Sequence, residues 1–142
     1  MTLIDTNLWL YACLQESPHH RAAKAWLEAT FNNEESIALP WNVVLAVLRI
    51  STQPRMMREP LSPRQAMDLV EGWLQHPLVT VVHPGPNHWS ILRQLLEQAG
   101  TAGNLTPDAH LAALAIEHNC TLYSADSDFG RFPGLRFRNP LR

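Results

Sequence analysis

Short runs of apolar and β-branched residues alternate with longer stretches of helical periodicity along the chain. The runs are only four or five residues long, and the stretches between the first four runs each have room for two helices. Strands this short and this far apart in sequence pair in parallel, with the connecting helices packed on the faces of the sheet. The sequence therefore predicts an α/β three-layer sandwich, with a short, mostly parallel sheet of four or five strands and helices on both faces. The predicted strands are residues 1–4, 36–39, 79–83, 121–124 and 135–138.

The stretches between these strands have recognisable helix ends. Ser17-Pro18 and Ser62-Pro63 each supply an N-cap residue followed by a proline that suits the first helical turn. Gly100 suits the position just after a helix. Residues 53–60 and 101–105 are expected to be loops. The predicted helices are residues 6–14, 19–31, 41–51, 64–75, 87–99 and 106–118.

The composition is that of a compact folded domain. Of the 142 residues, 46% are hydrophobic and 17% are charged, which argues against disorder. We expect residues 1–142 to form a single domain. No apolar run is long enough to span a bilayer, and Asp5 interrupts the apolar run at the start, so no membrane association is expected and the cytoplasm is the expected compartment. Cys13 and Cys120 are far apart in sequence and are expected to be reduced thiols.

The charge distribution gives a weak indication about partners. A net charge of −2 argues against a broadly basic surface for nucleic acid. Lys24 is the only lysine among 11 basic residues. Because a guanidinium group pairs with phosphate through two hydrogen bonds, a set made almost wholly of arginine is compatible with local contact to RNA or DNA. A genome composition biased toward arginine would produce the same count.

Aspartates stand at the expected ends of separate elements. Asp5 ends the first apolar run, Asp108 heads an alanine- and leucine-rich helix, and Asp126 and Asp128 follow the fourth strand. The carboxyl ends of parallel strands lie at one edge of a sheet, so Asp5, Asp108 and Asp126 are expected to converge there. Carboxylates a few ångströms apart repel by several kcal/mol at an effective dielectric of about 20, and a bound cation offsets that cost. All-oxygen ligation favours Mg²⁺ or Mn²⁺ over zinc.

Each aspartate also has a purely structural interpretation. Asp5 would cap the helix that follows it, and Asp108 would interact favourably with the dipole of its own helix. Asp126 and Asp128 would form a turn in which side chains bond the local backbone. Taken singly, the structural interpretations are favoured. Taken together, the acids favour a shared divalent cation.

Other chemistries have little support in the sequence. The seven histidines form no HExxH motif, no serine or cysteine stands in a nucleophile turn, and no glycine-rich phosphate loop is present. His19, His20 and His118 are expected on helix surfaces. An aspartyl-phosphate mechanism like that of haloacid dehalogenases needs a second aspartate two residues after Asp5, where Asn7 stands.

The five tryptophans have two interpretations. Trp9 follows Asp5 closely enough to lie near the cleft, or it faces a partner surface. The remaining four are expected in the core or at an interface, because they fall at helical positions. They are Trp26, Trp41, Trp73 and Trp89.

Three segments together resemble the motifs of PIN-domain ribonucleases. They are Leu3-Ile4-Asp5-Thr6-Asn7, residues 104–115 and Ser124-Ala125-Asp126-Ser127-Asp128-Phe129. Further segments resemble the branch that contains the VapC toxins of bacterial toxin–antitoxin pairs, namely Leu39-Pro40-Trp41, Pro60-Leu61-Ser62 and Phe132-Pro133-Gly134-Leu135. The resemblance extends over nearly the whole chain and implies a PIN-like sandwich, with residues 1–142 as a single PIN domain.

The resemblance implies a Mg²⁺- or Mn²⁺-dependent endoribonuclease, the toxin of a VapBC-type pair, which hydrolyses RNA to 5′-phosphate and 3′-hydroxyl ends. It also implies a cognate VapB-type antitoxin, a homodimer, and transfer RNA or ribosomal RNA loops as targets. Carried over by position, the metal-binding and catalytic acids are Asp5, Asp108 and Asp126. The auxiliary residues are Asp128, Ser124 and Asn7. Candidates for contact with RNA phosphates are Arg49, Arg55, Arg58 and Arg131.

One position departs from the family pattern. The family often carries a glutamate three residues before an arginine in the third helix, and here that place is Ala46. The number of metal ions, one or two, is therefore open, and we hypothesise that Asp128 supplies the missing charge. Ala46 motivates one alternative, a PIN-like module that binds RNA or protein without cutting. The other alternative is a metal-dependent DNA nuclease on the same scaffold.

Overall fold

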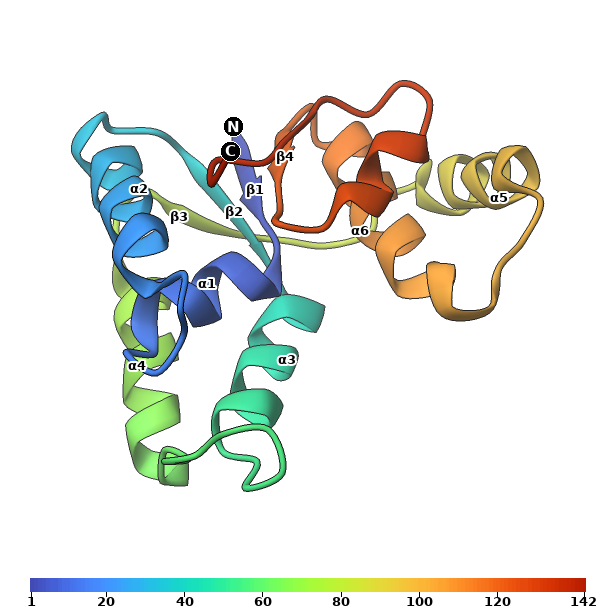
Figure 1. Cartoon of the computed structure of the whole chain (residues 1–142). Helices are drawn as coiled ribbons and strands as arrows, with labels where there is room; N and C mark the ends of the chain where they lie inside the picture. Colours follow the sequence, from blue (N-terminus) through green and yellow to red (C-terminus); the bar gives the residue numbers. More distant parts are fainter.

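The computed structural model describes all 142 residues and contains a five-stranded sheet (Figure 1). The strands are β1 (Thr2–Ile4), β2 (Ile37–Pro40), β3 (Val79–Val82), β4 (Thr121–Tyr123) and β5 (Phe137–Arg138), in the order β3-β2-β1-β4-β5. The predicted α/β sandwich is confirmed, and all pairings are parallel. The last strand is shorter than predicted because the Leu135 amide donates to the Phe132 carbonyl, which keeps Leu135 in the preceding turn.

Six α-helices and two short 3₁₀ helices connect the strands. The α-helices are α1 (Thr6–Cys13), α2 (His20–Asn32), α3 (Trp41–Ser51), α4 (Pro63–Gln75), α5 (His88–Ala99) and α6 (Thr106–Glu117). The 3₁₀ helices are η1 (Gly103–Leu105) and η2 (Ser127–Arg131). η1 lies inside the segment predicted to be a loop.

Local side-chain chemistry explains some of the helix ends. Ser62 and Gln65 form a reciprocal capping box at the start of α4, and Gly100 ends α5 with φ of 73°. α1 begins at Thr6, as predicted, because the Asp5 side chain accepts from the Thr6 amide and caps the helix there. Ser17 was expected to cap α2, but its hydroxyl accepts from the His19 amide in the turn before that helix.

The direction of the connections decides which helices cover which face. The chain moves one way across the sheet from β1 to β2 and β3, then returns past β1 to reach β4. Because parallel crossovers are right-handed, helices of the first two connections belong on one face and those of the third on the other. In Figure 1, α1 to α4 gather on one side of the sheet, and α5 and α6 pack together on the opposite side.

The reversal of strand order places a topological switch point beside the central strand. β1 has β2 on one side and β4 on the other, and the residues of β1 are all buried. Open α/β sheets form their ligand crevice outside the carboxyl ends of the strands at such a point. Asp5 follows β1, and Ser124 follows β4. The fold therefore delivers both residues to the position where this architecture usually carries chemistry.

The tryptophans correct part of the sequence interpretation. Trp9 is completely buried and stacks on Trp73 at 4.3 Å between ring centroids, so it belongs to the core and not to the cleft or a partner surface. Trp41 and Trp89 are 48% and 69% exposed, so neither lies in the core, and an interface position stays a prediction for both. Trp26 is half-buried and packs on Tyr123.

No helix in this structure combines the length and the apolar character required to cross a bilayer. Cys13 and Cys120 are both free thiols, as expected, although Cys13 is only half-buried.

The Trp9 contact provides a test of the core. We expect Trp9→Ala to lower the free energy of unfolding by about 3–5 kcal/mol, because it leaves a cavity against Trp73. Urea denaturation followed by circular dichroism measures the loss. The matched control is Trp89→Ala on the surface of α5, with an expected change of no more than about 0.5 kcal/mol. Equal losses in the two variants would contradict the buried position of Trp9.

Candidate metal centre

Asp5 is fixed at the junction between β1 and α1. Its amide donates to the Tyr123 carbonyl at 2.9 Å, which extends the pairing of β1 with β4 by one residue. Its Oδ1 accepts from the Thr6 amide at 2.7 Å, so the side chain caps α1 as the structural interpretation predicted. Asp5 is thus held through its amide on the side of β4 and through its carboxylate on the side of α1.

Ser124 joins the ends of β1 and β4 through its side chain. The residue is completely buried, and its hydroxyl donates to Asp5 Oδ2 at 2.7 Å. The same oxygen accepts from Asn7 Nδ2 at 3.2 Å and from the Asp126 amide at 3.0 Å. Asn7 Oδ1 in turn accepts from the Ala125 amide at 3.3 Å. Three of these four bonds link residues more than a hundred positions apart in sequence, and together they orient Asp5.

Asp126 and Asp128 lie in the turn after β4. Asp126 Oδ1 accepts from the Asp128 amide at 2.9 Å, and Asp126 caps η2. The predicted backbone-bonding turn is therefore present. This bond leaves the second carboxylate oxygen of Asp126 without a protein donor, and Asp128 is exposed.

Asp108 meets this turn from the first turn of α6. Carboxylate oxygens of Asp108, Asp126 and Asp128 all lie within 4.8 Å of one another. Asp5 stands outside this closest trio, so the structure gathers Asp128 more tightly with Asp108 and Asp126 than it gathers Asp5. Asp5 and Asp126 bond the local backbone and still contribute to the acidic cluster. Each of these backbone bonds uses only one of the two carboxylate oxygens.

The electrostatics of the cluster reflect its unbalanced charge. Burial, together with repulsion from Asp126, Asp5 and Asp128, raises the pKa of Asp108 to about 6. Burial also raises the pKa of Asp5, although hydrogen bonds from Ser124 and Thr6 oppose the shift, and Asp126 adds repulsion. No lysine or arginine forms an ion pair with any of these acids. The missing positive charge is what a cation would supply.

The donor set fits a hard divalent cation. All the side-chain donors in the trio are carboxylate oxygens, which magnesium and manganese prefer over softer ligands. Opposite ligands of Mg²⁺ stand about 4.2 Å apart, given bonds of roughly 2.1 Å. Adjacent ligands stand only about 3 Å apart in the same geometry, so separations of up to 4.8 Å have to shorten through side-chain rotation when an ion binds.

The other predicted site residues lie in less informative positions. Ala46 is half-buried in α3 and brings no charge. Arg49 is in the last turn of α3, and the remaining arginines lie in the loop after α3 or at the end of η2. All of these arginines are exposed, and none forms an ion pair, so contact with RNA stays a prediction for Arg49, Arg55, Arg58 and Arg131.

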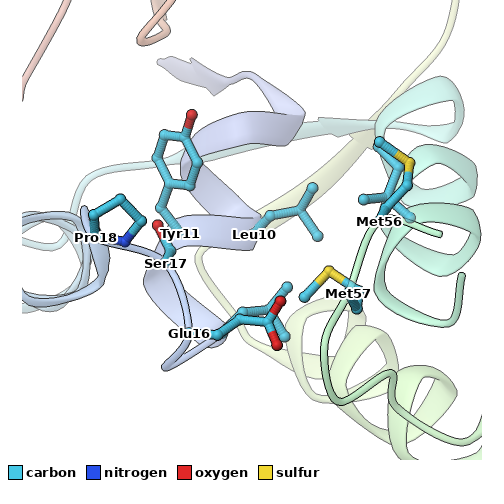
Figure 2. Close-up of a pocket in the computed structure, with 9 residues that line it drawn as sticks. Leu10, Tyr11, Glu16, Ser17, Pro18, Met56 and Met57 are labelled. Carbon is cyan, nitrogen blue, oxygen red and sulfur yellow. The ribbon is translucent and has the colours of Figure 1, made fainter. Parts of the chain in front are cut away.

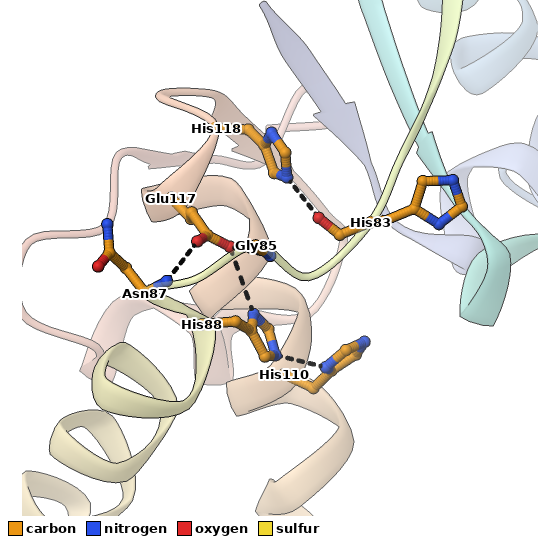
Figure 3. Close-up of polar contacts among 7 residues, drawn as sticks. All are labelled: His83, Gly85, Asn87, His88, His110, Glu117 and His118. Atoms are coloured by element: carbon orange, nitrogen blue, oxygen red, sulfur yellow. Dashed lines mark hydrogen bonds and ion pairs between the residues drawn. The ribbon is translucent and has the colours of Figure 1, made fainter.

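A polar group around two histidines was missed by sequence reasoning. His88 and His110 contact each other, and Glu117 lies beside His88 (Figure 3). His118 was expected on a helix surface, but it is half-buried and bonds to the His83 carbonyl through Nε2. No local spacing marks these residues, because they meet through the packing of α5 against α6.

His19 and His20 differ from each other although they are neighbours. His19 is exposed, as predicted. His20 is half-buried, and its Nδ1 contacts the Tyr11 carbonyl at 2.9 Å, so its assignment to the helix surface was wrong.

Comparison with known proteins gives a consistent result. The PIN domain family matches residues 2–135. The chain is 39% identical over 140 residues to ribonuclease VapC37 of Mycobacterium tuberculosis, covering 99% of this chain and 97% of that protein. It is 40% identical over 142 residues to ribonuclease VapC33 of the same species, covering 100% and 99%.

Solved structures of more distant proteins share the fold. VapBC2 from Rickettsia felis, bound to a promoter DNA fragment, has a TM-score of 0.70 at 22% identity, covering 97% of each chain. FitAB bound to a DNA fragment has a TM-score of 0.69 at 24% identity, covering 100% of this chain and 96% of that one. The acidic centre lies at the switch point, the PIN domain family matches residues 2–135, and the VapC relatives are 39–40% identical to this chain. This chain therefore belongs to the PIN-domain family, in the branch of the VapC ribonucleases.

Proposed function

We propose that this chain is a metal-dependent endoribonuclease and the toxin of a VapBC-type toxin–antitoxin pair. The observation that carries the proposal is the convergence of Asp108, Asp126 and Asp128 at the switch point, with no basic side chain to balance them. The ribonuclease names of relatives 39–40% identical over the full chain support the choice of RNA as substrate. We take residues 1–142 as a single PIN domain.

The acids divide into holding and orienting roles. Asp108, Asp126 and Asp128 would hold Mg²⁺ or Mn²⁺, with Asp5 as a further ligand at the edge of the trio. When bound, such an ion lowers the pKa of a water and offsets the charge that grows on the phosphate. Ser124 and Asn7 are positioning residues, because their hydrogen bonds set the direction of Asp5 and tie it to the Asp126 turn. No protein nucleophile is required.

The exposed arginines near the end of α3 and in η2 would contact RNA phosphates. An arginine pairs with a phosphate through two hydrogen bonds and sets the position of the strand without reading its sequence. We assign this role to Arg49, Arg55, Arg58 and Arg131, with loops of transfer RNA or ribosomal RNA as the target class.

An apolar pocket next to α1 suits the partner of such a toxin. It has a volume of about 270 Å³ and lies between α1, the segment before α2 and the loop after α3 (Figure 2). The lining residues are Leu10, Tyr11, Leu14, Glu16, Ser17, Pro18, Ile50, Met56 and Met57. The Glu16 carboxylate accepts from the Arg58 and Glu59 amides and so ties the loop after α3 to this wall. We place an apolar segment of a VapB-type antitoxin here.

Self-association and compartment complete the proposal. Trp41 and Leu45 are one turn apart on α3 and are both about half exposed or more. Large apolar side chains in such a position suit a contact with a second copy of the chain, in line with a homodimer. Two free thiols are compatible with the reducing cytoplasm, where we place the protein.

Cleavage of RNA is the direct test. We expect the purified chain, freed of antitoxin, to cut labelled RNA in the presence of Mn²⁺ and to lose that activity with EDTA. Asp126→Asn should lower the rate at least about 100-fold, because it removes a ligand charge. Asp128→Asn should weaken the affinity for Mn²⁺ if Asp128 supplies the charge that Ala46 lacks. Gel electrophoresis of the products and a Mn²⁺ titration measure the two effects.

The same assay separates the alternatives. Binding of RNA without cutting would favour the PIN-like binding module that Ala46 suggests, and preferential cutting of DNA would favour a DNA nuclease. An unchanged Mn²⁺ affinity in Asp128→Asn would contradict the role of Asp128. Asp68→Asn, an exposed acid on α4 away from the centre, is the matched control and should leave RNA cleavage unchanged.

The raised pKa of Asp108 predicts a pH-dependent stability. The unfolded carboxyl has an ordinary pKa of 3.8 and the folded one a pKa of about 6, so the metal-free folded state binds more protons between these values. Its stability therefore falls as the pH rises from 3.8 to about 6. In EDTA at pH 7, Asp108→Asn should melt about 2–5 °C above the unsubstituted protein, and the gain should disappear near pH 4.

Addition of Mn²⁺ should reverse this order. The ion stabilises the ionised Asp108 of the unsubstituted protein, and the variant lacks that ligand charge. Calorimetric melting curves with EDTA and with Mn²⁺ measure both effects. A destabilised Asp108→Asn variant in EDTA at pH 7 would refute the unbalanced charge of the cluster.

The apolar pocket predicts which substitution weakens the binding of the antitoxin. Met56 is 55% exposed at the pocket, so Met56→Glu should fold normally, yet weaken antitoxin binding at least about tenfold by burying a charge. Met67 is equally exposed on α4 outside this pocket, and Met67→Glu is the matched control. Calorimetric titration with the antitoxin measures both affinities. Equal affinities for the two variants would place the antitoxin elsewhere.

A further inference from the structure

A chain of three polar side chains connects α5 and α6 on the face of the sheet away from α1 to α4 (Figure 3). His88 is the first residue of α5, and its Nε2 lies 2.9 Å from Nδ1 of His110 in α6. The two rings are close to perpendicular, at 76°. On the other side of the His88 ring, Nδ1 lies 3.9 Å from Glu117 Oε1 at the end of α6. The order is carboxylate, imidazole, imidazole.

Glu117 is held in place by the backbone between β3 and α5. Its Oε1 accepts from the Gly85 amide at 2.8 Å, and its Oε2 accepts from the Asn87 amide at 2.9 Å. A Cβ at position 85 would lie 2.6 Å from Oε2, so the close approach of this carboxylate requires glycine there. The carboxylate therefore faces His88 from a fixed position.

The environment of His88 is that of a metal-ligating histidine. Its Nδ1 is buried and has no hydrogen-bond partner, but it faces the Glu117 carboxylate. Histidines that bind metals commonly direct one ring nitrogen at a carboxylate and offer the other to the ion. With the Nδ1 proton toward Glu117, Nε2 presents its lone pair toward His110. Burial lowers the pKa of His88, which favours the neutral ring that metal binding requires.

The separation of the two nitrogens matches a chelate. Two metal–nitrogen bonds of roughly 2.0–2.1 Å at a right angle place their nitrogens about 2.9 Å apart, and the observed separation is 2.9 Å. In the structure the two nitrogens share a hydrogen bond, and with the His88 proton on Nδ1 the shared proton is on His110 Nδ1. When an ion binds, that proton moves to His110 Nε2, and rotation of both rings turns the two lone pairs to one point. His110 is half-buried, so water has access to complete the coordination.

We propose that His88 and His110 form a binding site for a divalent transition metal ion of the copper, nickel and zinc class, separate from the acidic centre. Imidazole nitrogens suit these ions, whereas Mg²⁺ requires oxygen ligands. Glu117 is a positioning residue that orients His88. A bound ion would fasten the start of α5 to α6.

Copper binding to the full chain without an affinity tag tests the site. We expect Cu²⁺ to bind with an electron paramagnetic resonance spectrum that shows coupling to two imidazole nitrogens, and Mg²⁺ to leave that spectrum unchanged. His110→Asn keeps a polar atom close to the place of Nδ1 and so preserves a contact with His88, but its amide is a poor copper ligand. The affinity for Cu²⁺ should therefore fall at least about tenfold in this variant.

Two controls isolate the site. His83→Asn changes an exposed ring whose nitrogens form no hydrogen bond in the structure, and it should keep the affinity and the spectrum. Asp126→Asn should keep them as well, because the copper site does not include the acidic centre. Unchanged copper affinity in a folded His110→Asn variant, or a spectrum of the unsubstituted protein without two-nitrogen coupling, overturns the proposal. Circular dichroism of each variant verifies the fold.

Discussion

The hydrogen bond from the Ser124 hydroxyl to Asp5 is the interaction on which the candidate metal centre depends. It joins the ends of β1 and β4 at the point where the strand order reverses. Because Ser124 is completely buried, its hydroxyl has no alternative partner in water, and its oxygen also accepts from Asn7 and the Asp126 amide. One small side chain thus sets both the direction of Asp5 and the path of the acidic turn. The neighbouring acids converge because of this shared anchor.

The acidic centre shows how structural and functional roles combine in one residue. Asp5 caps α1, and Asp126 caps η2, yet each also adds negative charge to one small region. Burial first, and then repulsion from the neighbouring acids, raises the pKa of Asp108 to about 6. A capping role by itself does not require acids to crowd together. Elsewhere in the chain, Ser62 caps α4, and α3 begins with no side-chain cap at all. The repulsion between these acids lowers the stability of the metal-free fold. A divalent ion bound between them would offset that repulsion and stabilise the folded state.

Much of the fold was predictable because its signals are local. The proline and glycine at the ends of α4 and α5, and the short apolar strands between the helices, act through neighbouring residues in sequence. The errors arose where tertiary packing overrides position. Trp9 follows Asp5 by one helical turn, yet the face of α1 that carries it packs on Trp73 of α4. Leu135 was counted in the last strand, but its amide bonds within the turn before it. His88 lies at the start of α5, whereas His110 and Glu117 belong to α6, so they meet only when α5 packs against α6.

The sequence by itself determined the α/β class, the parallel pairing and the identity of the acids, because periodicity, capping and motif spacing are read over a few residues. The tertiary structure alone decided that Asp128 joins Asp108 and Asp126 within 4.8 Å of one another while Asp5 stays outside this group, since that arrangement depends on the path of the turn after β4. It also decided that two histidines and a glutamate line up across α5 and α6. Distances between residues far apart in sequence follow from strand order and helix packing, and no local pattern encodes them.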